Sequence, residues 1–144
     1  SGTPDLPIVA LNPALAAKLS GRILLQVQGK GEAWYIYPKT KQRHYLGRPA
    51  DAFAIMRSLG LGITNADLAK IPVADSKASL MSQLSTRLSG QILLQVESKG
   101  EAWYINPLTG KRHYLGRPSD AFAIMRSLGL GITNSDLAKI GSAK

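Results

Sequence analysis

Two sets of tyrosine, arginine and amide side chains carry most of the binding chemistry that this sequence offers. Both sets lie in short segments rich in β-branched and aromatic residues, where alternation along a strand places every second side chain on one face. Tyrosine rings can stack on sugar rings or bases, while Arg and amide groups bond hydroxyls or phosphates. We expect two ligand-binding tyrosine platforms, the first formed by Gln26, Tyr35, Tyr37, Arg43 and Tyr45, the second by Gln95, Tyr104, Asn106, Arg112 and Tyr114.

The residues typical of catalysis or metal binding do not occur in useful combinations. His44 and His113 have no cysteine and no second histidine near them in the sequence, so a metal site or a catalytic histidine lacks partners. Glu32 and Asp51 could form the carboxylate pair of a glycosidase, but Asp51 already suits a helix start and Glu32 lies in a turn. No Ser-His-Asp order, phosphate loop or dinucleotide fingerprint is present. We expect a non-enzymatic protein without cofactor or metal.

Composition narrows the class of protein and of partner. The 144 residues include 18 Lys and Arg against 9 Asp and Glu, 44% hydrophobic residues and no cysteine. This balance excludes a disordered tail, a disulfide framework and a cysteine-ligated metal site. The net charge of +9 favours polyanionic partners such as nucleic acid, acidic glycans or anionic cell-wall polymers. Apolar stretches such as Ala52–Met56 are far short of the roughly 20 residues that span a bilayer, so no membrane insertion is expected.

An internal repeat organises the chain. Leu15–Ile71 aligns without a gap on Leu84–Ile140, and 45 of the 57 aligned pairs are identical. The sequence is therefore a tandem duplication, with a first repeat over residues 1–72 and a second over residues 73–144. Pro72–Ser79 is the expected joint, because Pro72 stops the preceding helix and the stretch is small and polar.

Each repeat has the sequence pattern of an α-β-β-β-α-α module. Cap residues, turn residues and hydrophobic periods predict a three-stranded antiparallel meander with helices before and after it. In the first repeat the expected elements are a helix over Pro13–Leu19, strands over Ile23–Gln28, Ala33–Tyr37 and Arg43–Leu46, a helix from Pro49 to Gly60 and a short helix ending at Ile71. The second repeat follows the same order, with a longer first helix over Ala78–Leu88. The fold class is α+β, and since a unit of this size is marginal alone, we expect the repeats to pack with pseudo-twofold symmetry.

Strand alternation predicts which faces are buried. We expect Ile23, Leu25 and Val27 to share a face with Trp34 and Ile36, and this face to receive the amphipathic helix that follows Pro49. Trp34 and Trp103 are then core residues, and the tyrosine platforms face outward. The alternative is that the platforms pack against the other repeat, since tyrosine suits either setting.

Basic residues in two other positions have simpler explanations than ligand binding. Lys39 and Lys41 surround a hairpin tip and are expected to be solvated. Arg48 and Arg117 precede a helix start, where an ion pair with the following aspartate is favoured over contact with an anionic ligand.

A longer motif links the chain to a known kind of module. Both repeats contain Trp-Tyr-Ile-x-Pro followed by Arg-x-Tyr-Leu-Gly-Arg-Pro-x-Asp-Ala-Phe. With these residues the chain resembles a repeat module that occurs, often in tandem, in predicted secreted proteins of uncultured bacteria. The resemblance implies an extracellular accessory module attached to a surface or polymer, and it carries over no catalytic residues. No basic-then-apolar leader opens the sequence, so any export signal is expected to have been removed or to lie outside this sequence.

Together these observations favour an extracellular or cell-surface binding module. The favoured partner is a carbohydrate or cell-wall polymer held by both tyrosine platforms, with avidity from the duplication. The alternative is nucleic acid, with bases stacked on the same platforms and Lys and Arg on phosphates. A third interpretation is a structural or protein-interaction spacer whose aromatic faces are used up between the repeats. The oligomeric state stays open.

Overall fold

The computed structural model describes residues 6–75 and 83–143, which form an α+β structure with two matching sets of elements. The first repeat contains α1 (Pro13–Lys18), β1 (Ile23–Gln26), β2 (Ala33–Ile36), β3 (Arg43–Tyr45), α2 (Pro49–Ser58), β4 (Leu61–Ile63) and α3 (Asn65–Ala69). The second contains α4 (Gln83–Arg87), β5 (Ile92–Gln95), β6 (Ala102–Ile105), β7 (Arg112–Tyr114), α5 (Pro118–Ser127), β8 (Leu130–Ile132) and α6 (Asn134–Ala138).

Most of the predicted elements are confirmed, and the helix starts follow the expected capping chemistry. The Asn12 side chain accepts a hydrogen bond from the Leu15 N–H at the start of α1, and Thr64 accepts one from the Asp67 N–H at the start of α3. Arg48 pairs with Asp51 in the first turn of α2, with the Arg48 Nε atom 3.1 Å from the carboxylate, as predicted. For the expected helix over Ala78–Leu88, residues 78–82 lie outside the described part of the chain, as do residues 76–79 of the expected joint.

A short strand after each long helix was not expected from the sequence. β4 and β8 are three residues each, and both contain the Leu-Gly-Ile triplet that follows the glycine at the end of α2 or α5. Each meander is present as predicted, with β1 antiparallel to β2 and β2 antiparallel to β3. The additional strand pairs in parallel with the first strand of a meander, so each sheet is four-stranded and mixed.

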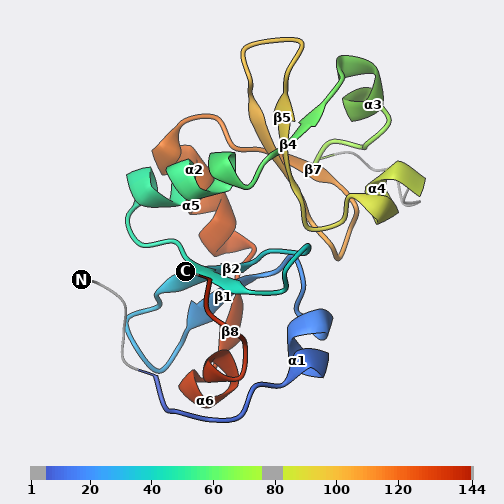
Figure 1. Cartoon of the computed structure of the whole chain (residues 1–144). Coiled ribbons are helices and arrows are strands. Elements are labelled where there is room, and N and C mark those ends of the chain that lie inside the picture. The colour runs from blue at the N-terminus through green and yellow to red at the C-terminus, as the bar shows by residue number, and fades with distance from the viewer. Residues whose placement is uncertain (1–5, 76–82, 144) are drawn as a thin grey trace.

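The additional strands are exchanged between the repeats (Figure 1). The first sheet has the order β3-β2-β1-β8, and the second has the order β4-β5-β6-β7. Each sheet thus combines the meander of one repeat with the fourth strand of the other. We call the exchanged segments, residues 61–73 and 130–143, the arms.

The strand register shows that one predicted face assignment was wrong. Leu24 is paired with Trp34, and Ile23 is paired with Tyr35. Directly paired residues point to the same face of a sheet, so Leu24 and Gln26 lie with Trp34, whereas Ile23 and Leu25 lie with Tyr35. The predicted grouping of Ile23, Leu25 and Val27 with Trp34 is shifted by one residue, and such a shift reverses the face of every side chain in the strand.

The faces are covered by different helices than expected. α2 and α5 pack against each other between the two sheets, and their buried Ala52, Met56, Ala121 and Met125 side chains join Tyr35 and Tyr104 in one central core. The long amphipathic helix therefore covers the tyrosine face. The Trp34 face is covered instead by α1 and α6, which contribute Ala16 and Leu137. Trp34 is buried, as predicted, but in this outer cluster.

In the pseudo-twofold packing, the repeats meet backbone to backbone at two equivalent glycines. Gly21 and Gly90 both have positive φ angles, of 78° and 76°, which favour glycine. A Cβ atom on Gly21 would lie 2.6 Å from the Cα atom of Gly90, closer than real Cβ atoms approach other atoms. The Tyr35 hydroxyl donates to the Gly90 carbonyl, and the Tyr104 hydroxyl donates to the Gly21 carbonyl, each at 2.5 Å. None of the helices in the described ranges is both long and apolar enough to cross a membrane.

Candidate binding site

The predicted tyrosine platforms do not exist as exposed surfaces. Tyr35 is 0% exposed and Tyr104 is 2% exposed, because both rings lie in the central core between the sheets. The two rings meet edge to face, with centroids 6.5 Å apart. The expectation that these two tyrosines face outward is wrong, and the alternative in which they pack between the repeats is confirmed for them.

Burial also changes the acidity of these two hydroxyl groups. Desolvation raises the pKa of Tyr35 well above its ordinary value, and the neighbouring Tyr104 raises it further. Burial likewise raises the pKa of Tyr104. Both hydroxyls are therefore neutral donors at physiological pH, and their protons are used in hydrogen bonds that join the repeats.

The other members of each predicted platform lie on the opposite face of the sheet. The register pairs Trp34 with Tyr45 and Ile36 with Arg43, so Arg43 and Tyr45 share the outer face with Gln26. The set was predicted as one surface because alternation fixes faces within a strand, but it does not fix the register between strands.

Gln26 and Gln95 connect Trp34 and Trp103 to the arm of the other repeat. The Trp34 Nε1–H donates to Gln26 Oε1 at 2.6 Å, and Gln26 Nε2 donates to Asn134 Oδ1 on α6 at 3.0 Å. The second sheet repeats this chain of bonds, from Trp103 through Gln95 to Asn65, at 2.7 and 3.1 Å. Both glutamines have their amides engaged in holding an arm.

Arg43 and Arg112 are used in the same way. The Arg43 Nε–H donates to the Ile140 carbonyl at 2.8 Å, and the Arg112 Nε–H donates to the Ile71 carbonyl at 2.7 Å. Each guanidinium carbon lies over a tryptophan ring, 4.8 Å from the Trp34 centroid and 4.5 Å from that of Trp103. Partial burial lowers the pKa of both arginines, although such a group stays charged in neutral solution.

Tyr37, Asn106 and the two histidines have local contacts. Tyr37 is half-buried and meets His44 edge to face, with centroids 6.0 Å apart. Its counterpart Asn106 accepts a hydrogen bond from the Leu108 N–H within the turn. Burial lowers the pKa of His44 and of His113, so both imidazoles are neutral at physiological pH. Among the residues that the structure describes, no group of three His, Asp or Glu side chains is placed to hold a metal ion.

Tyr114 is the member of the predicted set that offers a substantial surface. It is 49% exposed on the edge strand β7 and packs on Trp103, with ring centroids 5.0 Å apart. Trp103 is itself half-buried, whereas its counterpart Trp34 is 1% exposed. In the first sheet Leu6 packs against the equivalent cluster of Trp34 and Tyr45. The two outer faces therefore differ, and the second is the more open.

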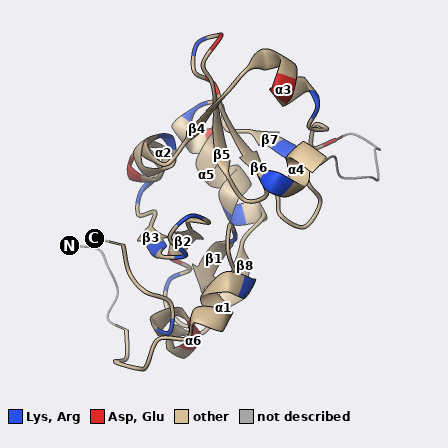
Figure 2. Ribbon diagram, turned by 45° about the vertical axis from the view of Figure 1, so that its right-hand side comes forward, with Lys and Arg blue, Asp and Glu red and all other residues tan. Residues whose placement is uncertain are grey.

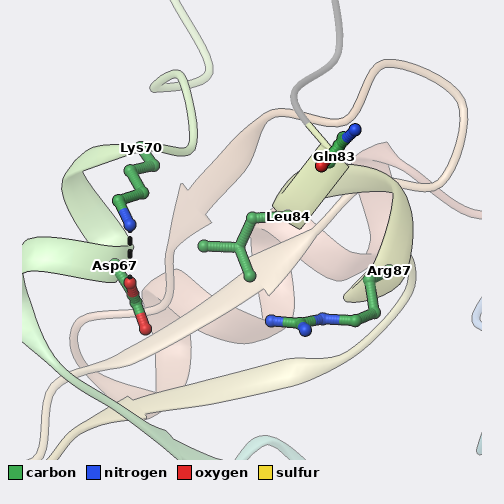
Figure 3. Close-up of a pocket in the computed structure, with 5 residues that line it drawn as sticks. All are labelled: Asp67, Lys70, Gln83, Leu84 and Arg87. Atoms are coloured by element: carbon green, nitrogen blue, oxygen red, sulfur yellow. Dashed lines mark hydrogen bonds and ion pairs between the residues drawn. The ribbon is translucent and has the colours of Figure 1, made fainter.

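A groove that the sequence did not reveal lies between α3 and α4. Its volume is about 570 Å³, and its lining residues are Asp67, Lys70, Gln83, Leu84 and Arg87 (Figure 3). Lys70 Nζ lies 3.1 Å from Asp67 Oδ1. The exposed Arg87 guanidinium extends across the groove and makes no ion pair or hydrogen bond with the rest of the described chain. Two cations, a carboxylate and an amide thus line one concave surface.

This groove could not be found from sequence spacing. Asp67 and Lys70 belong to the arm of the first repeat, whereas Arg87 belongs to α4 of the second. The exchange of arms between the repeats brings these residues together. The sequence carries no signal for this exchange beyond the Leu-Gly-Ile triplet. The equivalent positions in the other repeat carry Ala14 in place of Gln83 and Lys18 in place of Arg87. A second groove of about 320 Å³, between α1, the β2–β3 turn and the end of α6, includes Lys41 and Lys139 in its lining.

Comparison with protein-family models, with curated proteins and with solved structures found no match for this chain.

Proposed function

We propose that the chain is a non-catalytic extracellular binding module for an anionic glycan, with the groove between α3 and α4 taking one acidic sugar unit. The observation that carries the proposal is the exposed guanidinium of Arg87 at the wall of this groove, which forms no ion pair with the residues that the structure describes. A guanidinium presents a planar fork of donors that matches a carboxylate or phosphate. Gln83 and Asp67 can bond sugar hydroxyls in the same groove.

Three further features support an anionic, extended partner. The net charge is +9, and lysine and arginine are spread over both sheets and their helices (Figure 2). Tyr114 is a half-exposed ring suited to stacking on a sugar. The resemblance to modules of secreted bacterial proteins fits an accessory role at a surface or polymer, and we include the extracellular location in the proposal.

The test compares polymers of different charge and backbone. We expect the chain to bind soluble polygalacturonate and not neutral dextran, as measured by calorimetry at low and physiological salt. Arg87→Met removes the guanidinium and should weaken binding about tenfold, the order expected for a charge-assisted contact. Lys18→Met is the matched control, because it removes the equivalent cation of the first repeat, which does not line this groove.

Nucleic acid is the second candidate, favoured by the charge alone. Duplex DNA is the probe for it, and its affinity should fall steeply as salt rises if phosphate contacts carry the binding. DNA binding tighter than polygalacturonate binding, with no response to Arg87→Met, would show that the groove is not the site. Absence of binding to either polymer would leave the spacer interpretation.

A further inference from the structure

The arms form an interface between repeats that is more extensive than a single exchanged strand. β4 pairs with β5, so that Leu61 is opposite Leu93 and Ile63 is opposite Gln95. At the other end of the same arm, the Arg112 N–H donates to the Pro72 carbonyl at 2.8 Å, and Val73 forms a parallel bridge with Arg112 of β7. The arm therefore reaches from one edge of the β5-β6-β7 meander to the other, with α3 between (Figure 1).

The second arm holds the first sheet in the same way. β8 pairs with β1, and beyond α6 the Arg43 N–H donates to the Gly141 carbonyl at 2.8 Å. The Ala143 N–H returns a bond to the Arg43 carbonyl at 3.0 Å. Both backbone edges of each meander are thus bonded to the arm of the other repeat. Without the arm these edges would be unpaired, and unpaired sheet edges tend to associate with other strands.

The arms also bury the outer apolar face of the meander that they cross. Ile63, Leu68 and Ile71 are 6%, 4% and 0% exposed, and they form one cluster with Leu93 and Ile105 of the second repeat. Without an arm, the outer face of this meander would lose most of its apolar cover. The apolar surface exposed in this way is of the kind that binds partners.

The chain passes from one repeat to the other at Gly60 and Gly129. A Cβ atom on Gly60 would lie 2.7 Å from Leu94 Cγ, and one on Gly129 would lie 2.6 Å from Leu25 Cγ. The crossing therefore places backbone directly against the other repeat. The two crossings are equivalent, as in an isologous dimer whose subunits exchange one element.

The arms and their docking faces are nearly identical in the two repeats. The exceptions in the docking contacts are Gln28 and Glu97, which accept equivalent bonds from the arms, and the arm ends Pro72-Val73 and Gly141-Ser142. Residues 61–71 and 130–140 differ only at Ala66 and Ser135, and both are exposed. On the docking faces, Gln26, Trp34 and Arg43 have identical counterparts in the second repeat. An arm therefore fits the meander of its own kind as well as that of the other repeat.

We propose that each arm must dock on the meander of a second copy of this repeat. In this protein the second copy is the other repeat of the same chain, and for a single repeat it would be a second chain. This inference does not rest on the proposed glycan binding. In the tandem chain, the covalent link raises the effective concentration of the two repeats, so exchange within one molecule dominates. A repeat without a covalent partner should instead form an arm-exchanged homodimer.

Nicking the intact folded chain tests this proposal. A specific protease site is inserted after Asp75, the chain is cleaved after folding, and native mass spectrometry follows the products upon dilution and reconcentration. We expect the cleaved repeats to stay paired, and slow reassortment to give repeat 1 and repeat 2 homodimers beside the original pair. Two folded monomeric repeats after cleavage would overturn the proposal.

Engineered disulfides separate exchange from self-closure by a covalent readout. The chain has no native cysteine. Leu61→Cys with Leu93→Cys joins the arm to the other repeat, while Leu61→Cys with Leu24→Cys would join it to its own meander, since Leu24 is the counterpart of Leu93. After cleavage, a non-reducing gel should show linked fragments for the first pair. Both cysteines of the second pair lie in the first fragment, so thiol labelling of the denatured protein is the readout, and we expect both thiols to stay free. Separate fragments for the first pair, together with an oxidised second pair, would show that each repeat closes on its own arm.

Discussion

Tyr35 and Tyr104 show what sequence could and could not reveal at the scale of single residues. Alternation identified them correctly as pointing away from Trp34 and Trp103, but exposure depended on a second layer that no local pattern encodes. A tyrosine suits a binding surface and also a core in which its hydroxyl finds an acceptor. Here the acceptors are carbonyls of Gly90 and Gly21 from the other repeat, so these residues hold the molecule together.

Removing either buried hydroxyl should lower stability without changing the fold. Tyr35→Phe leaves the Gly90 carbonyl without its donor, and we expect the free energy of unfolding to fall by about 1–3 kcal/mol, the cost of an unsatisfied buried group. Urea denaturation measures the change. Tyr114→Phe is the control, because this ring is half exposed, and it should change stability by less than about 0.5 kcal/mol. An equal loss in both variants would contradict the structural role.

The raised pKa of both tyrosines predicts loss of stability in alkali. A phenol whose pKa is raised in the folded state favours the protonated form, so its contribution is complete below the unfolded value of 10.0 and is lost as pH rises above that value. Urea midpoints measured upward from neutral pH should therefore fall steeply beyond pH 10. The Tyr35→Phe, Tyr104→Phe double variant should flatten this decline. An unchanged decline would assign it to other groups.

Lys41 occupies a position that suits glycine. Its φ angle is 56°, in the left-handed region, and the equivalent Gly110 has a φ of 72°. A non-glycine residue costs roughly 1–2 kcal/mol in this conformation. Lys41→Gly should therefore raise the free energy of unfolding by up to about 1 kcal/mol, since extra freedom of the unfolded chain offsets part of the gain. Gly110→Lys is the reciprocal variant and should destabilise the protein; a shift of the same sign in both would contradict the argument.

At the scale of elements, the sequence predicted local structure better than pairing. Helix caps, hairpin turns and the 3.6-residue period of α2 depend on residues close together in the sequence. The helices and hairpins that they predict form where expected. β4 and β8 were missed because Leu-Gly-Ile is too short for a period. Its strand state depends on a partner strand in the other repeat, about 30 residues away for β4 and more than 100 residues away for β8. The face error in β1 has a related cause, since register depends on the partner strand as well as on the pattern of β1.

The contact between Gly21 and Gly90 gives a prediction about how the elements meet. Gly21→Ala adds a Cβ atom against backbone of the other repeat, in addition to the strain of its positive φ angle. Gly47→Ala is the matched control, because Gly47 also has a positive φ, of 53°, but its nearest neighbour would be 3.5 Å away. We expect Gly47→Ala to cost roughly 1–2 kcal/mol in urea unfolding and Gly21→Ala to cost clearly more. Similar costs would mean that the repeats can separate locally without penalty.

At the scale of the whole molecule, duplication, fold class and pseudo-twofold packing followed from the sequence, but the interlocking did not. Self-similarity at an offset of 69 residues shows that two similar units exist. It does not show which repeat receives which arm, because the two docking faces carry nearly the same residues, and where they differ Gln28 and Glu97 accept equivalent bonds from Asn134 and Asn65. The groove between α3 and α4 depends on which repeat receives the arm, so it lies at a boundary between repeats that the sequence pattern does not define.

Interlocked arms predict that the two sheets unfold together. Trp34 lies in the first sheet and Trp103 in the second, so Trp103→Phe and Trp34→Phe leave one fluorescent reporter in each. In each variant, the fluorescence midpoint in urea should coincide with the midpoint from far-UV circular dichroism, as in a two-state transition. Adding Leu137→Ala creates a cavity in the cluster around Trp34, at a cost of about 2–5 kcal/mol. Because Leu137 belongs to the arm that joins both repeats, it should lower the midpoint reported by Trp103 as much as that reported by Trp34. A Trp103 midpoint that stays in place would show two independent halves, and the arms would then be attachments rather than part of one cooperative structure.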